Sequence, residues 1–196
     1  MDRGRLCQVA TPQALYEMPA NVFVARFMGS PPMNLLIGRI AAEGDGLICH
    51  LADSVIDLPE GLVAARPALK AYVGRELIVG VRPDAFALRP PGEEGLAARV
   101  YLSELLGSES LVHVETDARA PHGDDGGGSL PPWDAAGDGV GRLSGRFAGD
   151  TRGRAPGDAV TLALDPARFE LFDLDSGAAL ARVESHDRSG AVVPRP

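Results

Sequence analysis

The sequence predicts a mainly β protein in which a small antiparallel barrel or sandwich follows two short helices. Short apolar runs recur at a spacing of about ten residues, which is typical of antiparallel sheets. Turn signals such as Gly44-Asp45-Gly46 and Pro59-Glu60-Gly61 separate these runs. Near the N-terminus, Phe23 and Phe27 instead lie four positions apart, which indicates a helix with an apolar stripe.

The first thirty residues contain the helical signals. We expect a short strand at residues 5–9. Thr11 is then a helix N-cap, and Pro12 takes the first helical position, where its missing N–H costs nothing. These signals predict one helix over residues 12–17 and, after the break at Met18-Pro19, a second over residues 21–28. Two short helices cannot bury an apolar stripe by themselves.

A domain boundary is predicted at Ser30-Pro31-Pro32, because each proline pushes the preceding residue out of the helical region. Beyond this boundary the alternation and turn signals predict a series of strands. They are expected at residues 35–41, 47–51, 54–58, 76–82, 97–106, 110–116, 159–164 and 169–173.

One long segment departs from this pattern. Residues 118–157 contain 11 Gly and 4 Pro but only five large apolar side chains. Such a segment cannot offset its ordering entropy, so we expect a largely disordered insertion with an ordered strand at residues 142–147. The expected organisation is therefore residues 1–30, a domain over 31–180 with this insertion, and a flexible tail at 181–196.

Composition excludes several classes of function. The formal charge is −8, so the Lys and Arg excess of a nucleic-acid binder is absent. Lys70 is the single lysine and follows no phosphate-binding glycine loop, so binding or hydrolysis of ATP is not expected. The four histidines are isolated and offer no metal-ligand spacing. His113, in an alternating run, is interpreted as a strand side chain rather than a general base.

The N-terminal pattern also carries a family resemblance. Residues 4–35 resemble the junction at which the ATPase domain ends and the regulatory domain begins in ATP-binding subunits of carbohydrate importers of the maltose and glycerol-3-phosphate type. The residues that carry it are Gly4-Arg5-Leu6, Gln8-Val9, Thr11-Pro12, Leu15-Tyr16, Pro19-Ala20-Asn21, Phe23-Val24-Ala25, Phe27-Met28-Gly29 and Ser30-Pro31-Pro32-Met33-Asn34-Leu35.

Three later segments follow in the same family's order. Gly80-Val81-Arg82-Pro83-Asp84 looks like its Gly-Ile-Arg-Pro-Glu, and Glu104-Leu105-Leu106-Gly107-Ser108-Glu109 resembles its Leu-Gly-x-Glu turn. Residues 164–173 resemble its final strand. Three departures are Asp84 in place of glutamate, Ala14 where a glutamate often completes a capping box, and the Gly- and Pro-rich expansion.

The resemblance implies a fold and a function. The fold would be a small OB-like (TOBE) barrel preceded by two helices left over from an α/β ATPase domain. This chain would be the regulatory and dimerisation domain, without catalytic or metal residues and without a cofactor of its own. The ATP and Mg²⁺ motifs of full-length relatives would lie upstream of Met1, which would make the chain a truncated form.

The resemblance also implies partners and contact residues. A second copy of the chain, a cytoplasmic regulator and, once an ATPase domain is supplied, the transporter membrane subunits would be its partners, at the inner face of the cell membrane. The expected regulatory or dimer contacts are Gly80, Arg82, Pro83, Asp84, Leu106 and Gly107. In a complete subunit, apolar N-terminal side chains would pack on the ATPase domain and are expected to be uncovered here: Leu15, Tyr16, Val22, Phe23 and Phe27.

Two alternatives stay open on the sequence. The chain could be a free-standing module that binds a small oxyanion such as molybdate, although such a site needs clustered backbone N–H donors or Ser, Thr and Arg side chains. Arg82 and Asp84 could also form a local ion pair that merely closes a turn.

Overall fold

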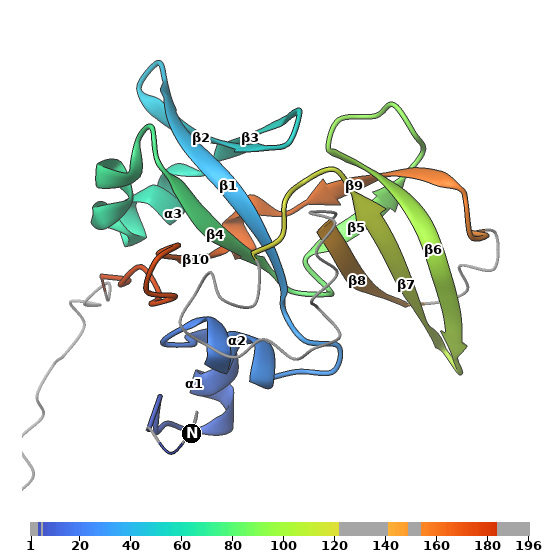
Figure 1. Ribbon diagram of the computed structural model, residues 1–196, viewed down its shortest axis with the longest axis horizontal. Coiled ribbons are helices and arrows are strands. Elements are labelled where there is room, and N and C mark those ends of the chain that lie inside the picture. The colour runs from blue at the N-terminus through green and yellow to red at the C-terminus, as the bar shows by residue number, and fades with distance from the viewer. Residues whose placement is uncertain (1–3, 5, 122–140, 149–153, 184–196) are drawn as a thin grey trace, which may run out of the picture.

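The computed structural model describes residue 4 and residues 6–121, 141–148 and 154–183. It is mainly β, as predicted, and its strands form two antiparallel sheets (Figure 1). The described parts of the predicted insertion and tail are residues 118–121, 141–148, 154–157 and 181–183, and the rest of both lies outside the described residues.

The N-terminal helices form where their caps predict them. Helix α1 (Pro12–Glu17) begins after Thr11, whose side chain accepts a hydrogen bond from the Ala14 amide. Helix α2 (Val22–Phe27) begins after Asn21, whose side chain accepts from the Val24 amide. The strand expected at residues 5–9 is wrong, since residues 6–10 have no regular structure. Gln8 instead bonds to the backbone of the α1–α2 connection, donating to the Met18 carbonyl and accepting from the Ala20 amide.

The first sheet has the order β10-β4-β1-β2-β3. Its strands are β1 (Asn34–Glu43), β2 (Gly46–Leu51), β3 (Ser54–Leu58), β4 (Glu76–Val81) and β10 (Glu170–Phe172). Helix α3 (Glu60–Ala65) and the short 3-10 helix η1 (Pro67–Tyr72) connect β3 to β4. The sequence predicted only a turn at Pro59-Glu60-Gly61, and the helix forms because Leu62 is drawn into the core.

The second sheet has the order β5-β9-β6-β7-β8. Its strands are β5 (Phe86–Arg89), β6 (Leu96–Leu106), β7 (Glu109–Thr116), β8 (Gly141–Ala148) and β9 (Ala159–Leu164), with the 3-10 helix η3 (Pro166–Arg168) after β9. Strand β8 confirms the strand expected within the insertion. The sequence did not predict β5.

The sequence left a barrel or a sandwich open, and the described strands form two sheets rather than one closed barrel. Among the described residues, the edge strands β3 and β10 of the first sheet do not pair with each other. The chain leaves this sheet at Pro83, which lacks the amide needed to continue a ladder. Within the described ranges, strands β5 to β9 pair with one another, and β10 returns to β4 (Figure 1).

The sheets share one apolar core. Side chains of the first sheet such as Leu36 and Ile40 pack in the same cluster as Val112 and Leu143 of the second. Asn34 joins the two sheets: its side-chain amide donates to the carbonyls of Val81 and Ser144, at 3.0 Å each, and its oxygen accepts from the Ser144 amide. A smaller cluster lies on the outer face of the first sheet, where Val22 and Ala25 of α2 pack against Met33, Leu35, Ile78 and Phe172.

Candidate functional site

The predicted contact residues around Arg82 lie where the N-terminal helices meet the first sheet. Strand β4 ends at Val81, and the Ala85 amide donates to the Arg82 carbonyl at 2.9 Å, which closes a turn with Pro83 in its favoured second position. This turn directs the Arg82 side chain back along the sheet, toward α1 and α2. Arg82 is 5% exposed, although arginine is rarely buried unless its donors are paired.

The Arg82 guanidinium binds the C-terminal ends of both helices. It donates to the carbonyl of Ala25 in the last turn of α2, at 3.4 Å, and to the carbonyl of Met28, the C-cap residue of α2, at 2.8 Å. It also donates to the Tyr16 carbonyl in the last turn of α1. The last carbonyls of a helix lack partners within the helix and carry the negative end of its dipole. One cation therefore satisfies two helix ends, and we call Tyr16, Ala25, Met28 and Arg82 the Arg82 junction.

The positively charged guanidinium of Arg82 is largely shielded from water. Burial lowers the pKa of its guanidinium, against the opposing influence of Tyr16, Glu170 and Asp84. Its guanidinium carbon lies 3.9 Å from the centre of the Tyr16 ring, so the ring covers one face of the cation. A positive charge removed from water in this way must keep its acceptors, which makes the junction sensitive to the position of α1 and α2.

The remaining predicted residues of this segment contact other parts of the same chain. Asp84 pairs with Arg168 of η3, which donates to its carboxylate and to its backbone carbonyl at 2.7 Å each. The local Arg82–Asp84 pair considered above is therefore not the arrangement found. The Pro83 carbonyl accepts from the Arg146 amide of β8, and the Arg146 guanidinium donates to the Ser30 carbonyl.

Gly80 is buried inside the first sheet. It pairs with Leu35 of β1 and Glu170 of β10, and a Cβ at this position would collide with the sulfur of Met33. Glycine is favoured at position 80 because the neighbouring side chains leave no room for a Cβ.

Leu106 and Gly107 lie far from the junction, in the turn between β6 and β7. Gly107 has a φ of +67°, a conformation that favours glycine, and Leu106 pairs with Glu109. Several apolar side chains around this turn are exposed, with Leu105 at 52% and Leu106 at 56%. A bulge between Val100 and Leu102 changes which side chains of β6 face outward. We call Leu102, Leu105, Leu106 and Gly107 the hairpin surface.

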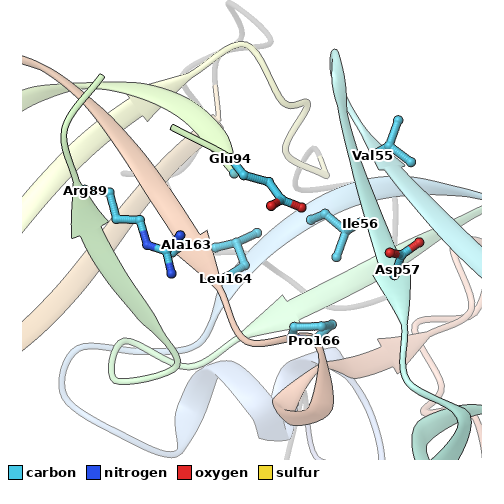
Figure 2. A pocket seen from close by; sticks show the side chains of 9 residues that line it. Val55, Ile56, Asp57, Arg89, Glu94, Ala163, Leu164 and Pro166 are labelled. Carbon is cyan, nitrogen blue, oxygen red and sulfur yellow. The ribbon is translucent and has the colours of Figure 1, made fainter. Parts of the chain in front are cut away.

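A cleft of about 260 Å³ lies where β3 faces the second sheet (Figure 2). Figure 2 shows Glu94 reaching toward Ile56 of β3, with Arg89 on the side of Ala163 and Leu164. The Ser54 hydroxyl donates to the Gly95 carbonyl at 2.9 Å and closes one end of the space between the sheets. The cleft is smaller than the ligand pockets of proteins, which start at about 300 Å³.

Within the described parts of the chain, no group of three or more His, Cys, Asp or Glu residues could hold a metal ion. Over the same residues, no helix is long and apolar enough to cross a membrane. Cys49 is buried, and burial raises the pKa of its thiol to about 12, so it is not a reactive nucleophile at neutral pH.

Comparison with known proteins identifies two domain families in tandem. The family described as the MalK OB fold domain matches residues 29–86, and the family described as the TOBE domain matches residues 79–123. The Arg82 turn lies in the overlap of the two matches.

The alignments with curated relatives cover from 58% to 92% of this chain. The trehalose/maltose import ATP-binding protein MalK of Thermococcus litoralis is 35% identical over 186 residues, which cover 92% of this chain and 43% of that protein. The sn-glycerol-3-phosphate import ATP-binding protein UgpC of Salmonella paratyphi A is 40% identical over 114 residues, covering 58% and 30%. The oligosaccharides import ATP-binding protein MsmX of Bacillus subtilis is 34% identical, covering 60% and 32%. The chain thus spans less than half the length of each of these relatives.

A solved structure of the cytoplasmic molybdate-binding protein ModG is also similar in part. It aligns with a TM-score of 0.44 at 16% sequence identity, covering 70% of this chain and 94% of that one. A likeness of this degree supports no functional inference.

Proposed function

Because the chain carries the OB-fold and TOBE domains of the sugar-import ATP-binding subunits, we propose that it is the regulatory and dimerisation domain of such a subunit. The importer would carry a sugar or glycerol-3-phosphate. The main observation in support of this proposal is the Arg82 junction, which connects α1 and α2 to the first sheet. By resemblance, these helices are the end of an ATPase domain, so the junction is where a change in one part would reach the other.

Two surfaces have distinct roles in this proposal. The exposed side of α2, where Phe27 is 76% exposed and stacks on Phe23 with ring centres 6.1 Å apart, would face the ATPase domain. The hairpin surface would contact a second copy of the chain or a cytoplasmic regulator, because its large apolar side chains are exposed and such side chains are enriched at interaction sites. The membrane subunits would be reached only through the ATPase domain, which places the assembly at the inner face of the membrane.

A chimaera tests the proposal. The aligned part of Thermococcus litoralis MalK is replaced by this chain, and ATP hydrolysis and transport are measured with the cognate membrane subunits. We expect both to continue, because α1 and α2 supply the contacts that the ATPase domain needs. The same chimaera with Arg82→Met should hydrolyse ATP but lose its coupling to transport. A folded chimaera that neither hydrolyses ATP nor assembles would refute the assignment.

A further inference from the structure

A second concave site lies on the outer face of the second sheet. Its volume is about 410 Å³, within the range of small-molecule pockets. Cross-strand pairing brings its side chains together, because Glu115 lies opposite Arg142 and His113 lies opposite Ser144 on β7 and β8. We call it the outer groove, and the residues that line it are Pro31, Pro32, Asn34, Tyr101, His113, Glu115, Arg142 and Ser144.

The polar groups of the outer groove are held in fixed positions. The His113 ring is fixed between Ser144 Oγ, 2.8 Å from its Nδ1, and Glu104 Oε2, 3.3 Å from its Nε2. Arg142 donates through Nε to Glu115 Oε1 at 3.1 Å. Asn34 is committed to the Ser144 backbone, and the segment that carries Pro31 and Pro32 is held by the bond from Arg146 to Ser30. A site built in this way is ordered before any ligand arrives.

The groove combines an aromatic wall with paired donors and acceptors. The rings of Tyr101 and His113 have centres 5.6 Å apart, and Pro31 and Pro32 also line the groove. Burial raises the pKa of the Tyr101 hydroxyl, so it stays a hydrogen-bond donor at neutral pH. Beside it, the carboxylate of Glu115 accepts hydrogen bonds and the guanidinium of Arg142 donates them.

These features select among classes of ligand. Two adjacent hydroxyls of a sugar match a carboxylate next to a guanidinium, since one hydroxyl donates while the other accepts. The C–H face of a pyranose ring fits an aromatic wall. An oxyanion fits poorly, because the charge of the Arg142 guanidinium is balanced by Glu115, and Glu104 adds a second carboxylate at the edge.

We propose that the outer groove binds a neutral pyranose sugar, with the ring against Tyr101 and vicinal hydroxyls on Glu115 and Arg142. Sugar binding in the outer groove would require neither an ATPase domain nor membrane subunits. It would hold for the chain on its own.

The test is a titration of the full chain with methyl α-D-glucopyranoside, a closed and uncharged pyranose, followed by amide chemical shifts. We expect saturable shifts at His113, Glu115 and Ser144 with millimolar affinity. The Glu115→Gln variant should bind about tenfold more weakly, because one charge-assisted hydrogen bond is lost. Tyr101→Ala should weaken binding further than Tyr101→Phe, which keeps the ring.

The matched control is Glu76→Gln. Glu76 pairs with Arg119 at 3.0 Å on another part of the surface, with an exposure similar to that of Glu115. This variant should bind as the parent does. Three results would overturn the proposal: an absence of saturable shifts with the pyranoside, tighter binding of sulfate or molybdate at the same amides, or equal affinity in Glu115→Gln, Tyr101→Ala and the control.

Discussion

The guanidinium carbon of Arg82 lies 3.9 Å from the centre of the Tyr16 ring, although the two residues are 66 positions apart in the chain. The same guanidinium donates to the Tyr16 carbonyl. The end of α1 is therefore fixed to the end of β4 by both the ring and the backbone of a single residue. This contact determines where the N-terminal helices lie on the first sheet.

Replacing Arg82 by methionine should release α1 and α2 from the sheet. The carbonyls of Tyr16, Ala25 and Met28 would lose a charged donor, which costs about 2 kcal/mol in the free energy of unfolding. Hydrogen exchange of the amides in residues 12–28 should accelerate strongly, while exchange in the second sheet should not change. Arg39→Met, at an exposed position of β1, is the control. Equal exchange in the two variants would contradict the role of the junction.

The hairpin surface should mediate self-association. We expect the double variant Leu105→Ser and Leu106→Ser to shift the chain from dimer to monomer in sedimentation velocity, because it removes two side chains that are more than half exposed. Val55→Ser removes an apolar side chain of similar exposure from β3 and should leave the dimer intact. A parent chain that is monomeric at high concentration would exclude dimerisation through this surface.

Val22 and Phe27 should differ sharply in their effect on stability. The expectation that Val22 is left uncovered is wrong, because it is 4% exposed and packs on Met33, Leu35, Ile78 and Phe172. Val22→Ala should lower the free energy of unfolding by about 2 kcal/mol. Phe27→Ala should cost less than about 1 kcal/mol, since Phe27 is 76% exposed.

The burial of Val22 also determines what truncation should do. A chain that begins at Ser30 would uncover the outer face of the first sheet, so it should self-associate more than the full chain in light scattering. Similar stability losses for Val22→Ala and Phe27→Ala in denaturant unfolding would show that α2 does not pack as described.

Tyr72 and Asp173 should make stability depend on pH at both extremes. The Tyr72 hydroxyl donates to Asp173 at 2.7 Å. Hydrogen bonds from Ser176 and Tyr72 lower the pKa of Asp173 to about 2, while burial and Asp173 raise the pKa of Tyr72 to about 12. The Asp173 contribution is present above its unfolded pKa near 4 and is lost as the pH falls toward 2. The Tyr72 contribution is present below about pH 10 and is lost as the pH rises through 12.

Tyr72→Phe tests this coupling. It should flatten the alkaline loss of stability and reduce the acid loss, because Ser176 still bonds to Asp173. The measurement is the midpoint of urea unfolding at a series of pH values. An unchanged profile in the variant would mean that the hydrogen bond makes no net contribution to stability.

Local signals placed most of the elements. Thr11 before Pro12 set the start of α1, and turn residues such as Asp45-Gly46 separated the strands, because caps and tight turns depend on a few adjacent residues. The apolar periodicity gave a mainly β chain. Residues 4–35, together with later segments such as the motif around Arg82, gave the family resemblance, which the domain matches confirm. Helix α3 was missed because it depends on the burial of Leu62 rather than on a local start signal.

The arrangement of the elements was decided only in three dimensions. The sequence by itself determined which segments are helices or strands and which family they resemble, because those properties lie in short stretches of residues. Only the tertiary structure decided that the strands form two sheets, that Arg82 turns inward to α1 and α2, and that Tyr101, Glu115 and Arg142 meet in one groove. Each depends on the register between strands distant in the chain, which is selected by packing of the whole core rather than by local propensity.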